Sequence, residues 1–161
     1  MLNQTNAMNT ETWLGNLIGK KTENKNIKIL FSIITVFLGS LLLIASAKIK
    51  VPLYPVPMTL QPLAVLMIAM LCGRNISVAA VSLYLFQGII GMPVFAYGGG
   101  LPYLLGPTGG FLLGFLFASI IIGELADRGW GKYMIKSVFA MLIGMFVIYF
   151  CGILQLSFFF H

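Results

Sequence analysis

The sequence predicts an all-α integral membrane protein built as a helical bundle of five transmembrane helices. Of the 161 residues, 59% are hydrophobic and 9% are charged, and the mean hydropathy is +0.97. This composition is typical of a chain that crosses a membrane several times, and it excludes a soluble globular class. The charged residues lie in short segments between long apolar runs, and these runs are the predicted spans.

Residues 1–28 are rich in Asn, Thr and Lys, so we expect a polar cytoplasmic tail without regular structure ahead of a transmembrane domain at residues 29–161. The alternative is a short interfacial helix, because apolar residues from Trp13 to Ile18 recur at helical spacing and Lys20 and Lys21 follow at a polar end. No small-residue cleavage site precedes the first apolar run, so we expect a retained span rather than a signal peptide.

The first predicted span, residues 29–47, carries no charge and is long enough to cross the bilayer at about 1.5 Å per residue. On it, Thr35 and Gly39 form a pair of small residues against which a partner helix could pack closely. The alternative is a chance pair on a helix that faces lipid. The later spans are predicted at residues 60–72, 76–90, 109–126 and 133–155.

The connection between the first two spans is rich in proline. Pro52, Pro55 and Pro57 force an extended chain, which we expect to form an ordered cap. Thr59 is placed to cap the second span, and Pro62 is tolerated in the first turn of a helix.

Polar side chains are rare within the spans and therefore informative. Gln61 begins the second span, where its amide either bonds to another helix or contacts a ligand. Tyr84 and Gln87 are three residues apart on the third span and so share a helical face.

Residues 88–110, the glycine-rich segment, contain eight glycines and three prolines, so no continuous helix can run through them. Irregular backbone at membrane depth survives only where it is buried in protein or lines a cavity, which predicts a ligand site. Thr108 can cap the following helix, whose first N–H groups would then face the cavity. The alternative is a plain turn between two spans.

No arrangement of residues indicates catalysis or a metal site. Glu124 and Asp127 share a helical face, but with Arg128 beside them we expect a solvated helix end. The single histidine, His161, is the last residue of the chain. Cys72 and Cys151 are predicted on opposite sides of the bilayer and therefore as free thiols.

The cations predict the orientation. With a cytoplasmic N-terminus, eight of the ten Lys and Arg residues lie on the inner side, and Lys48 and Lys50 lie outside. This distribution follows the positive-inside rule. The proline-rich cap and the glycine-rich segment then both lie on the outer side, where the bottom-up expectation is a small, mostly apolar ligand. The net charge of +6 is thereby explained without a nucleic-acid partner.

Five short motifs together closely resemble the BioY family, the biotin-binding S components of energy-coupling-factor (ECF) transporters. They are residues 55–61, 84–88, 91–95, 98–100 and 105–110. The resemblance covers about residues 30–155, with the motifs in the same order. It implies a six-helix bundle in the cell (inner) membrane, with both termini cytoplasmic. It also implies partnership with a transmembrane coupling protein and a pair of ATPases, and an S component that is not itself an enzyme.

The resemblance implies biotin as the transported substrate, bound under the two outer loops, with no cofactor. Three chemical groups of biotin then need partners: the ureido ring, the thioether ring and the carboxylate. The candidates for the ureido ring are Thr59, Gln61, Tyr84 and the backbone of Gly98, Gly99 and Gly100. Those for the thioether ring are Phe95, Tyr97 and Tyr103. The carboxylate would meet Thr108, Gly109 and Gly110, or else Lys48 or Lys50.

Three features depart from the family pattern. Five spans are predicted where the family has six, which would remove part of the site. The alanine pair expected on the first helix for docking the coupling protein is replaced by Thr35 and Gly39. Residues 1–28 are not covered by the resemblance. These departures leave two other interpretations open, a non-functional remnant of such a subunit and an S component for another small vitamin.

Overall fold

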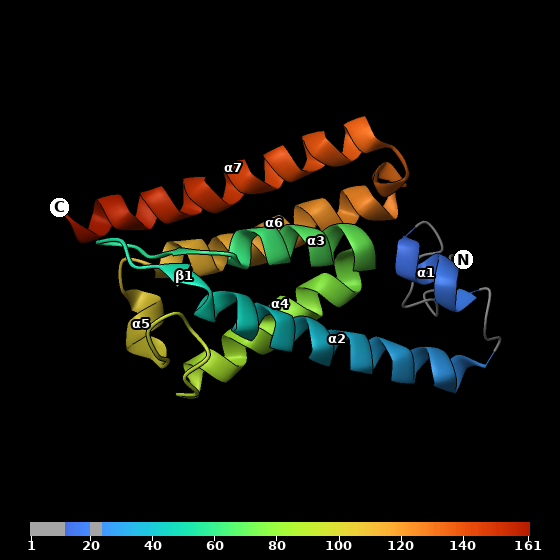
Figure 1. Cartoon of the computed structure of the whole chain (residues 1–161), viewed down its shortest axis with the longest axis horizontal. Coiled ribbons are helices and arrows are strands. Elements are labelled where there is room, and N and C mark those ends of the chain that lie inside the picture. Colours follow the sequence, from blue (N-terminus) through green and yellow to red (C-terminus); the bar gives the residue numbers. More distant parts are fainter. Residues whose placement is uncertain (1–11, 20–23) are drawn as a thin grey trace.

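The computed structural model describes residues 12–19 and 24–161, and most of them are helical (Figure 1). The helices are α1 (Trp13–Gly19), α2 (Lys25–Lys48), α3 (Gln61–Cys72), α4 (Arg74–Ile89), α5 (Leu101–Leu105), α6 (Gly109–Asp127) and α7 (Met134–Phe159), with a short 3-10 helix η1 at Trp130–Lys132. The strands β1 (Lys50–Val51) and β2 (Met58–Thr59) form a small antiparallel hairpin between α2 and α3. The prediction of an all-α membrane bundle is confirmed.

The five predicted spans correspond to α2, α3, α4, α6 and α7. Of the helices described, α2, α6 and α7 are long and apolar enough to cross a membrane, so the chain is a multi-pass membrane protein. The other two are shorter, with 12 residues in α3 and 16 in α4, against the roughly 20 that a full crossing requires. They are short because the proline-rich cap and the glycine-rich segment take up the neighbouring sequence.

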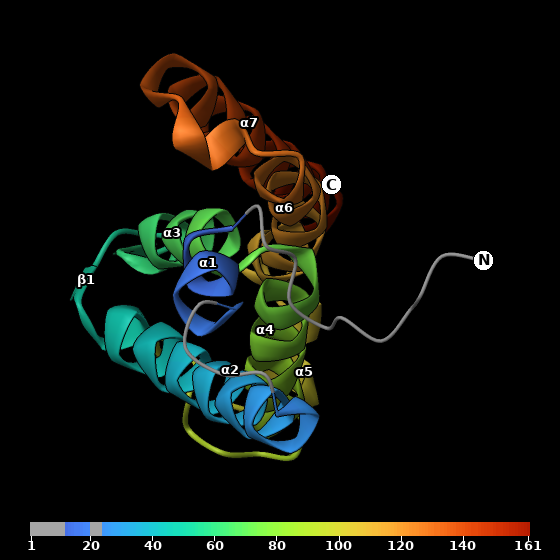
Figure 2. The ribbon, with the colours of Figure 1, turned by 90° about the vertical axis from the view of Figure 1, so that its right-hand side faces the viewer.

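Helix α6 lies at the centre of the bundle and packs against α3, α4 and α7, while α2 packs against α4 (Figure 2). The core between these helices is mostly apolar, and its fully buried residues include Leu43, Val65, Val81, Ile122 and Ile148. Large apolar side chains on the outward faces of α2 and α7, such as Phe37 and Phe146, are exposed. Such faces suit contact with lipid.

The two ends of the bundle differ. One end, the hairpin end, carries the β-hairpin, α5 and the irregular part of the glycine-rich segment. The opposite end, the turn end, carries the α3–α4 and α6–α7 connections. Cys72 ends α3 at the turn end, whereas Cys151 lies on α7 beside Gly110 at the hairpin end, and both thiols are free as predicted.

Helix α1 corrects the prediction of an unstructured tail, which is wrong for residues 13–19. The alternative of a short helix holds because Ile18 and Thr12 are buried against the turn end, while Trp13 and Leu17 are exposed. The first long helix also begins at Lys25, four residues earlier than predicted. The rest of the predicted tail, residues 1–11 and 20–23, lies outside the described residues.

Candidate functional site

A pocket of about 200 Å3 opens at the hairpin end, between the hairpin, the glycine-rich segment and the adjoining ends of α3, α6 and α7. This volume is below the roughly 300–1,000 Å3 common for small-molecule sites, which restricts a ligand to a small compound. None of the lining side chains carries a charge: they are Val56, Pro57, Met58, Thr59, Gln61, Pro62, Ala96, Tyr103, Thr108, Phe111, Leu112, Phe115 and Tyr149. The cavity therefore suits a ligand body that is neutral and partly apolar.

Gln61 supplies a buried amide in the pocket wall. Its Nε2 donates a hydrogen bond to the Tyr84 hydroxyl over 2.6 Å, and that hydroxyl in turn donates to the Val94 carbonyl over 3.4 Å. The Gln61 residue is 3% exposed and Tyr84 is completely buried, so this chain of bonds is shielded from water. Both alternatives for Gln61 are compatible here: the amide joins two helices and also borders the cavity.

Thr59 fixes the beginning of α3. Its hydroxyl oxygen accepts a hydrogen bond from the Gln61 N–H over 3.3 Å, which satisfies one of the free donors of the first turn. The helix begins one residue later than predicted, with Pro62 in its first turn as expected. Because Thr59 and Gln61 both line the pocket, helix capping and pocket geometry depend on the same residues.

Phe95 and Tyr103 form the aromatic side of the site. Their rings are stacked with centroids 5.0 Å apart, and Phe95 meets the Tyr84 ring edge-on at 5.5 Å. Tyr103 lines the cavity directly, whereas Phe95 is fully buried behind it. The predicted pair is therefore together, with Phe95 supporting Tyr103 rather than facing the ligand space.

Thr108 lines the pocket at the beginning of α6, but its predicted cap is wrong: the side chain makes no capping hydrogen bond because the residue has a helical backbone conformation. The side chain lies next to the Tyr103 hydroxyl instead. The Gly109 N–H donates to the Gly106 carbonyl over 3.1 Å, so it does not face the cavity as a free donor. Gly109 is buried behind the wall.

Gly98 and Gly99 also lie outside the lining of the pocket. Gly98 accepts a hydrogen bond from the Phe95 N–H over 2.8 Å and so closes a tight turn. Gly99 packs against the Met92 carbonyl, where a side chain would overlap the backbone. In this structure both glycines shape the loop that carries Phe95 and Ala96 to the site.

Lys48 and Lys50 are bonded to backbone carbonyls and do not line the cavity. The Lys48 ammonium donates to the carbonyls of Pro93 over 2.7 Å and Phe95 over 2.9 Å. The Lys50 ammonium donates to the Ala96 carbonyl and lies 3.6 Å from the centre of the Tyr97 ring. The two lysines thus join the hairpin side of the site to the glycine-rich segment.

Thr35 and Gly39, the predicted docking pair, do not share an outward surface. Gly39 is buried, and a Cβ there would lie 3.0 Å from the Ala80 Cβ, so it serves the contact between α2 and α4. Thr35 is half-buried and donates to the Phe31 carbonyl over 2.7 Å. Docking of a partner at this pair stays a prediction.

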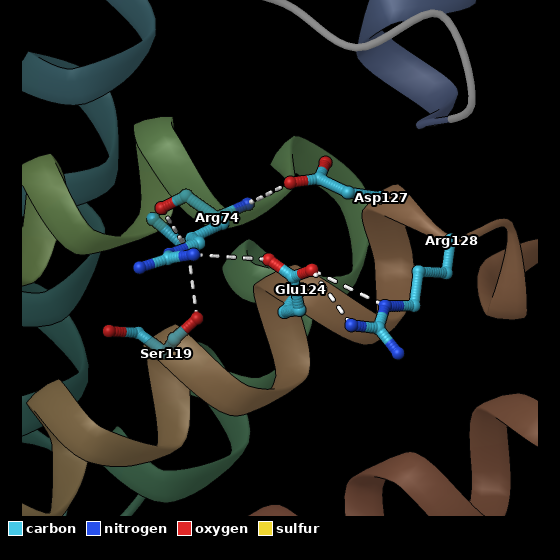
Figure 3. Close-up of polar contacts among 6 residues, drawn as sticks. Arg74, Ser119, Glu124, Asp127 and Arg128 are labelled. Atoms are coloured by element: carbon cyan, nitrogen blue, oxygen red, sulfur yellow. Dashed lines mark hydrogen bonds and ion pairs between the residues drawn. The ribbon is translucent and has the colours of Figure 1, made fainter.

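The two acidic residues that the structure describes, Glu124 and Asp127, lie at the turn end, and neither lines the pocket (Figure 3). Glu124 lies between Arg74 and Arg128 and pairs with each over 3.2 Å. Asp127 accepts a hydrogen bond from the Arg74 N–H over 3.2 Å and so holds the beginning of α4. Within residues 12–19 and 24–161, no cluster of three His, Cys, Asp or Glu residues could hold a metal ion.

Several residues of the site were not predicted. Phe111, Phe115 and Tyr149 line the cavity, yet in the sequence they look like any aromatic residue of an apolar span. Gln155 had a clearer signal, since it is an isolated amide late in an apolar helix. Its Nε2 donates to the carbonyls of Gly106 over 2.7 Å and Leu104 over 3.2 Å, which fastens α7 to the loop before α6.

Known proteins are similar to this chain in sequence. A biotin transporter BioY of Thermotoga maritima is 38% identical over 123 residues, which cover 74% of this chain and 70% of the relative. A probable biotin transporter BioY of Lysinibacillus sphaericus is 36% identical over 118 residues, covering 73% and 60%. The chain therefore spans 60–70% of the length of these two relatives.

A solved structure matches as well. The crystal structure of the S-component for biotin from an ECF-type ABC transporter superposes with a TM-score of 0.69 at 27% identity, over 85% of this chain and 75% of that one. The model of the BioY family matches residues 20–161, which is most of the sequence. With its loop motifs at the hairpin end, its helical bundle and this match, the chain belongs to the BioY family.

Proposed function

We propose that the chain is the substrate-binding membrane subunit of a biotin uptake system, an S component that works with an ECF coupling protein and ATPases. The observation that carries the proposal is the uncharged pocket at the hairpin end, where the buried Gln61 amide lies opposite aromatic walls. The names of the relatives and of the matching structure support biotin as the ligand. Biotin is then the cargo and not a cofactor.

The chemistry of biotin suits the lining. A ureido ring offers two N–H donors and one carbonyl acceptor, which match the carbonyl oxygen and the second N–H of Gln61. The Thr59 hydroxyl, which donates to the same carbonyl oxygen over 3.5 Å, borders this place. The thioether ring suits the aromatic surfaces of Tyr103 and Tyr149. In this arrangement the ring system lies inside, and the carboxylate lies toward the beginning of α6 or the opening of the pocket.

The orientation belongs to the same proposal. Arg74, Arg128, Lys132 and Lys136 lie toward the turn end, whereas Lys48 and Lys50 lie at the hairpin end. By the positive-inside rule the turn end is cytoplasmic and the pocket opens to the outer face of the cell membrane. The N-terminus is then cytoplasmic, and the pocket captures its ligand from outside.

Binding of labelled biotin to the detergent-purified chain tests the proposal. We expect saturable binding to one site per chain without ATP, because capture precedes any energy-consuming step. Gln61→Ala should weaken binding at least about tenfold, the effect of losing one hydrogen bond to a buried polar group. Absence of saturable binding by a well-folded preparation would favour a non-functional remnant, and preference for another vitamin would replace biotin.

A further inference from the structure

The pocket lies beneath the line of contact, here called the seam, between two segments that are far apart in the sequence. One side is the hairpin segment, residues 48–60, which runs from the last residue of α2 to the beginning of α3 and contributes Val56, Pro57, Met58 and Thr59 to the lining. The other side is the glycine-rich segment, which contributes Ala96, Tyr103 and Thr108. A ligand that enters the pocket on this side has to pass between the two segments, while α6 and α7 form the other side of the pocket.

The glycine-rich side is anchored in the bundle. Phe95 is fully buried, with its ring held between those of Tyr84 and Tyr103. The Gln155 amide holds the carbonyls of Leu104 and Gly106 from α7. To move this segment would expose a large aromatic side chain and break buried contacts, so it forms the fixed side of the seam.

The hairpin side has few anchors. Its strands pair over only two residues each, and the connecting loop exposes Leu53 and Tyr54, the latter to 91%. A two-stranded hairpin of this size has little stability of its own. The hairpin segment is therefore the side of the seam that can move.

Lys48 and Lys50 provide the hydrogen bonds across this seam among the residues described. They lie at the end of α2 and on β1, and their ammonium groups donate to the carbonyls of Pro93, Phe95 and Ala96. Lys50 also lies over the ring of Tyr97, which adds a cation–π contact. Ammonium groups on long, flexible side chains at a surface rehydrate readily, so such bonds can break and re-form.

We propose that Lys48 and Lys50 are positioning residues that clasp the hairpin segment against the fixed glycine-rich segment and thereby set the rates at which ligand enters and leaves the pocket. The inference rests on the proposed function only where biotin is the probe. The closure itself is a property of the chain without ligand.

A cysteine probe measures closure without any ligand. Ala96→Cys places a thiol at a buried position of the pocket wall, in a chain whose Cys72 and Cys151 are replaced by Ala. We expect Lys48→Met together with Lys50→Met to raise the rate of reaction with a water-soluble maleimide about three- to tenfold, the range for losing charge-assisted hydrogen bonds near a surface. Arginine at both positions keeps the charge and the donors and should restore slow labelling.

Lys136→Met is the matched control, because Lys136 lies 4.7 Å from the Tyr133 ring in a similar contact at the opposite end of the bundle. It should leave the labelling rate unchanged. Equal rates in the wild type and the double methionine variant would overturn the clasp. An equal rise in Lys136→Met would also overturn it, because loosening would then be general.

Biotin kinetics on the full chain give the second readout. With the clasp removed, the association and dissociation rate constants should both rise about three- to tenfold, while the dissociation constant changes less than either. A purely structural role would raise dissociation alone. If the wild type binds no biotin, the proposed function fails while the maleimide result still decides whether the lysines close the seam.

Discussion

The Gln61 amide and the Tyr84 hydroxyl are joined by a hydrogen bond of 2.6 Å that links α3 to α4 beside the pocket. Both side chains are buried, so removal of the Tyr84 hydroxyl would leave the Gln61 Nε2 without this partner, whereas Tyr84 without Gln61 would still donate to the Val94 carbonyl. The same bond fixes the amide in one orientation, in which its carbonyl oxygen accepts a hydrogen bond from the Thr59 hydroxyl over 3.5 Å and its second N–H is left for a ligand. The same two residues therefore join α3 to α4 and orient the amide that we propose binds the ligand.

Substitutions in this pair can separate its contribution to stability from its contribution to biotin binding. Tyr84→Phe leaves the Gln61 amide without its partner and should destabilise the detergent-solubilised protein by about 1–3 kcal/mol. Gln61→Leu combined with Tyr84→Phe removes both polar groups and should recover much of that stability. Thermal unfolding measures the recovery. Biotin binding should stay impaired in the double variant, because the amide itself is gone; binding at the wild-type level would show that Gln61 is structural only.

A substitution of Tyr149 tests whether the side of the pocket formed by α7 contributes to biotin binding. Its ring meets Phe111 edge-on, with centroids 5.9 Å apart, and both residues line the cavity. Tyr149→Leu should weaken biotin binding by about 0.5–1.5 kcal/mol, the usual contribution of such an aromatic contact. Isothermal titration on the purified protein measures the change. Phe146→Leu is the control, since Phe146 points away from the bundle on the same helix.

A substitution of Gly88 tests how closely α4 packs against the ring of Phe95. A Cβ at this position would overlap the Phe95 ring, which has no room to withdraw because Tyr84 and Tyr103 lie against it. Gly88→Ala should therefore destabilise the protein by about 1–3 kcal/mol, as overpacking of a core does, and should weaken binding in parallel. The measurement is thermal unfolding with and without biotin.

Gly131→Ala is the matched control for that change. A Cβ there meets the Met70 sulfur at an ordinary 3.4 Å, on the far side of the bundle. It should leave stability and binding close to those of the wild type. Similar losses in the two variants would contradict the close fit of Phe95.

A substitution of Glu124 tests whether the ion pairs at the turn end affect biotin binding or only stability. Its two ion pairs are exposed, with 38% of the Glu124 side chain accessible, and such pairs contribute about 0–1 kcal/mol. Glu124→Gln should lower the unfolding temperature slightly in low salt and less in high salt, because ions screen these pairs. Biotin binding should not change; a large loss would show that the turn end and the pocket are coupled.

The helices and several pocket residues could be predicted from the sequence because they depend on residues that are close together in the chain. Proline and glycine forced irregular backbone at one end, and rare polar residues stood out, so Thr59, Gln61, Tyr103 and Thr108 were all expected at the cavity that they line. Tyr84 and Phe95 were expected there too and lie immediately behind the wall. These residues are close in space because the hairpin and the glycine-rich segment lie at the same end of the bundle.

What the sequence did not reveal depends on packing. In an apolar helix every face looks alike, so nothing separated Tyr149, which lines the pocket, from Phe146, which faces outward. Small residues were ambiguous for the same reason, and Gly39 packs against Ala80 inside the bundle. The contacts of Lys48 and Lys50 with carbonyls also required knowledge of where a distant loop returns.

Equilibrium binding of biotin to the purified chain and to Gln61→Ala, measured at a temperature at which both proteins are folded, is the most direct measurement. The account predicts saturable binding to one site in the wild type and binding weakened at least about tenfold in the variant. Equal binding by the two proteins, or no saturable binding by a folded wild type, would contradict a site built around the buried amide.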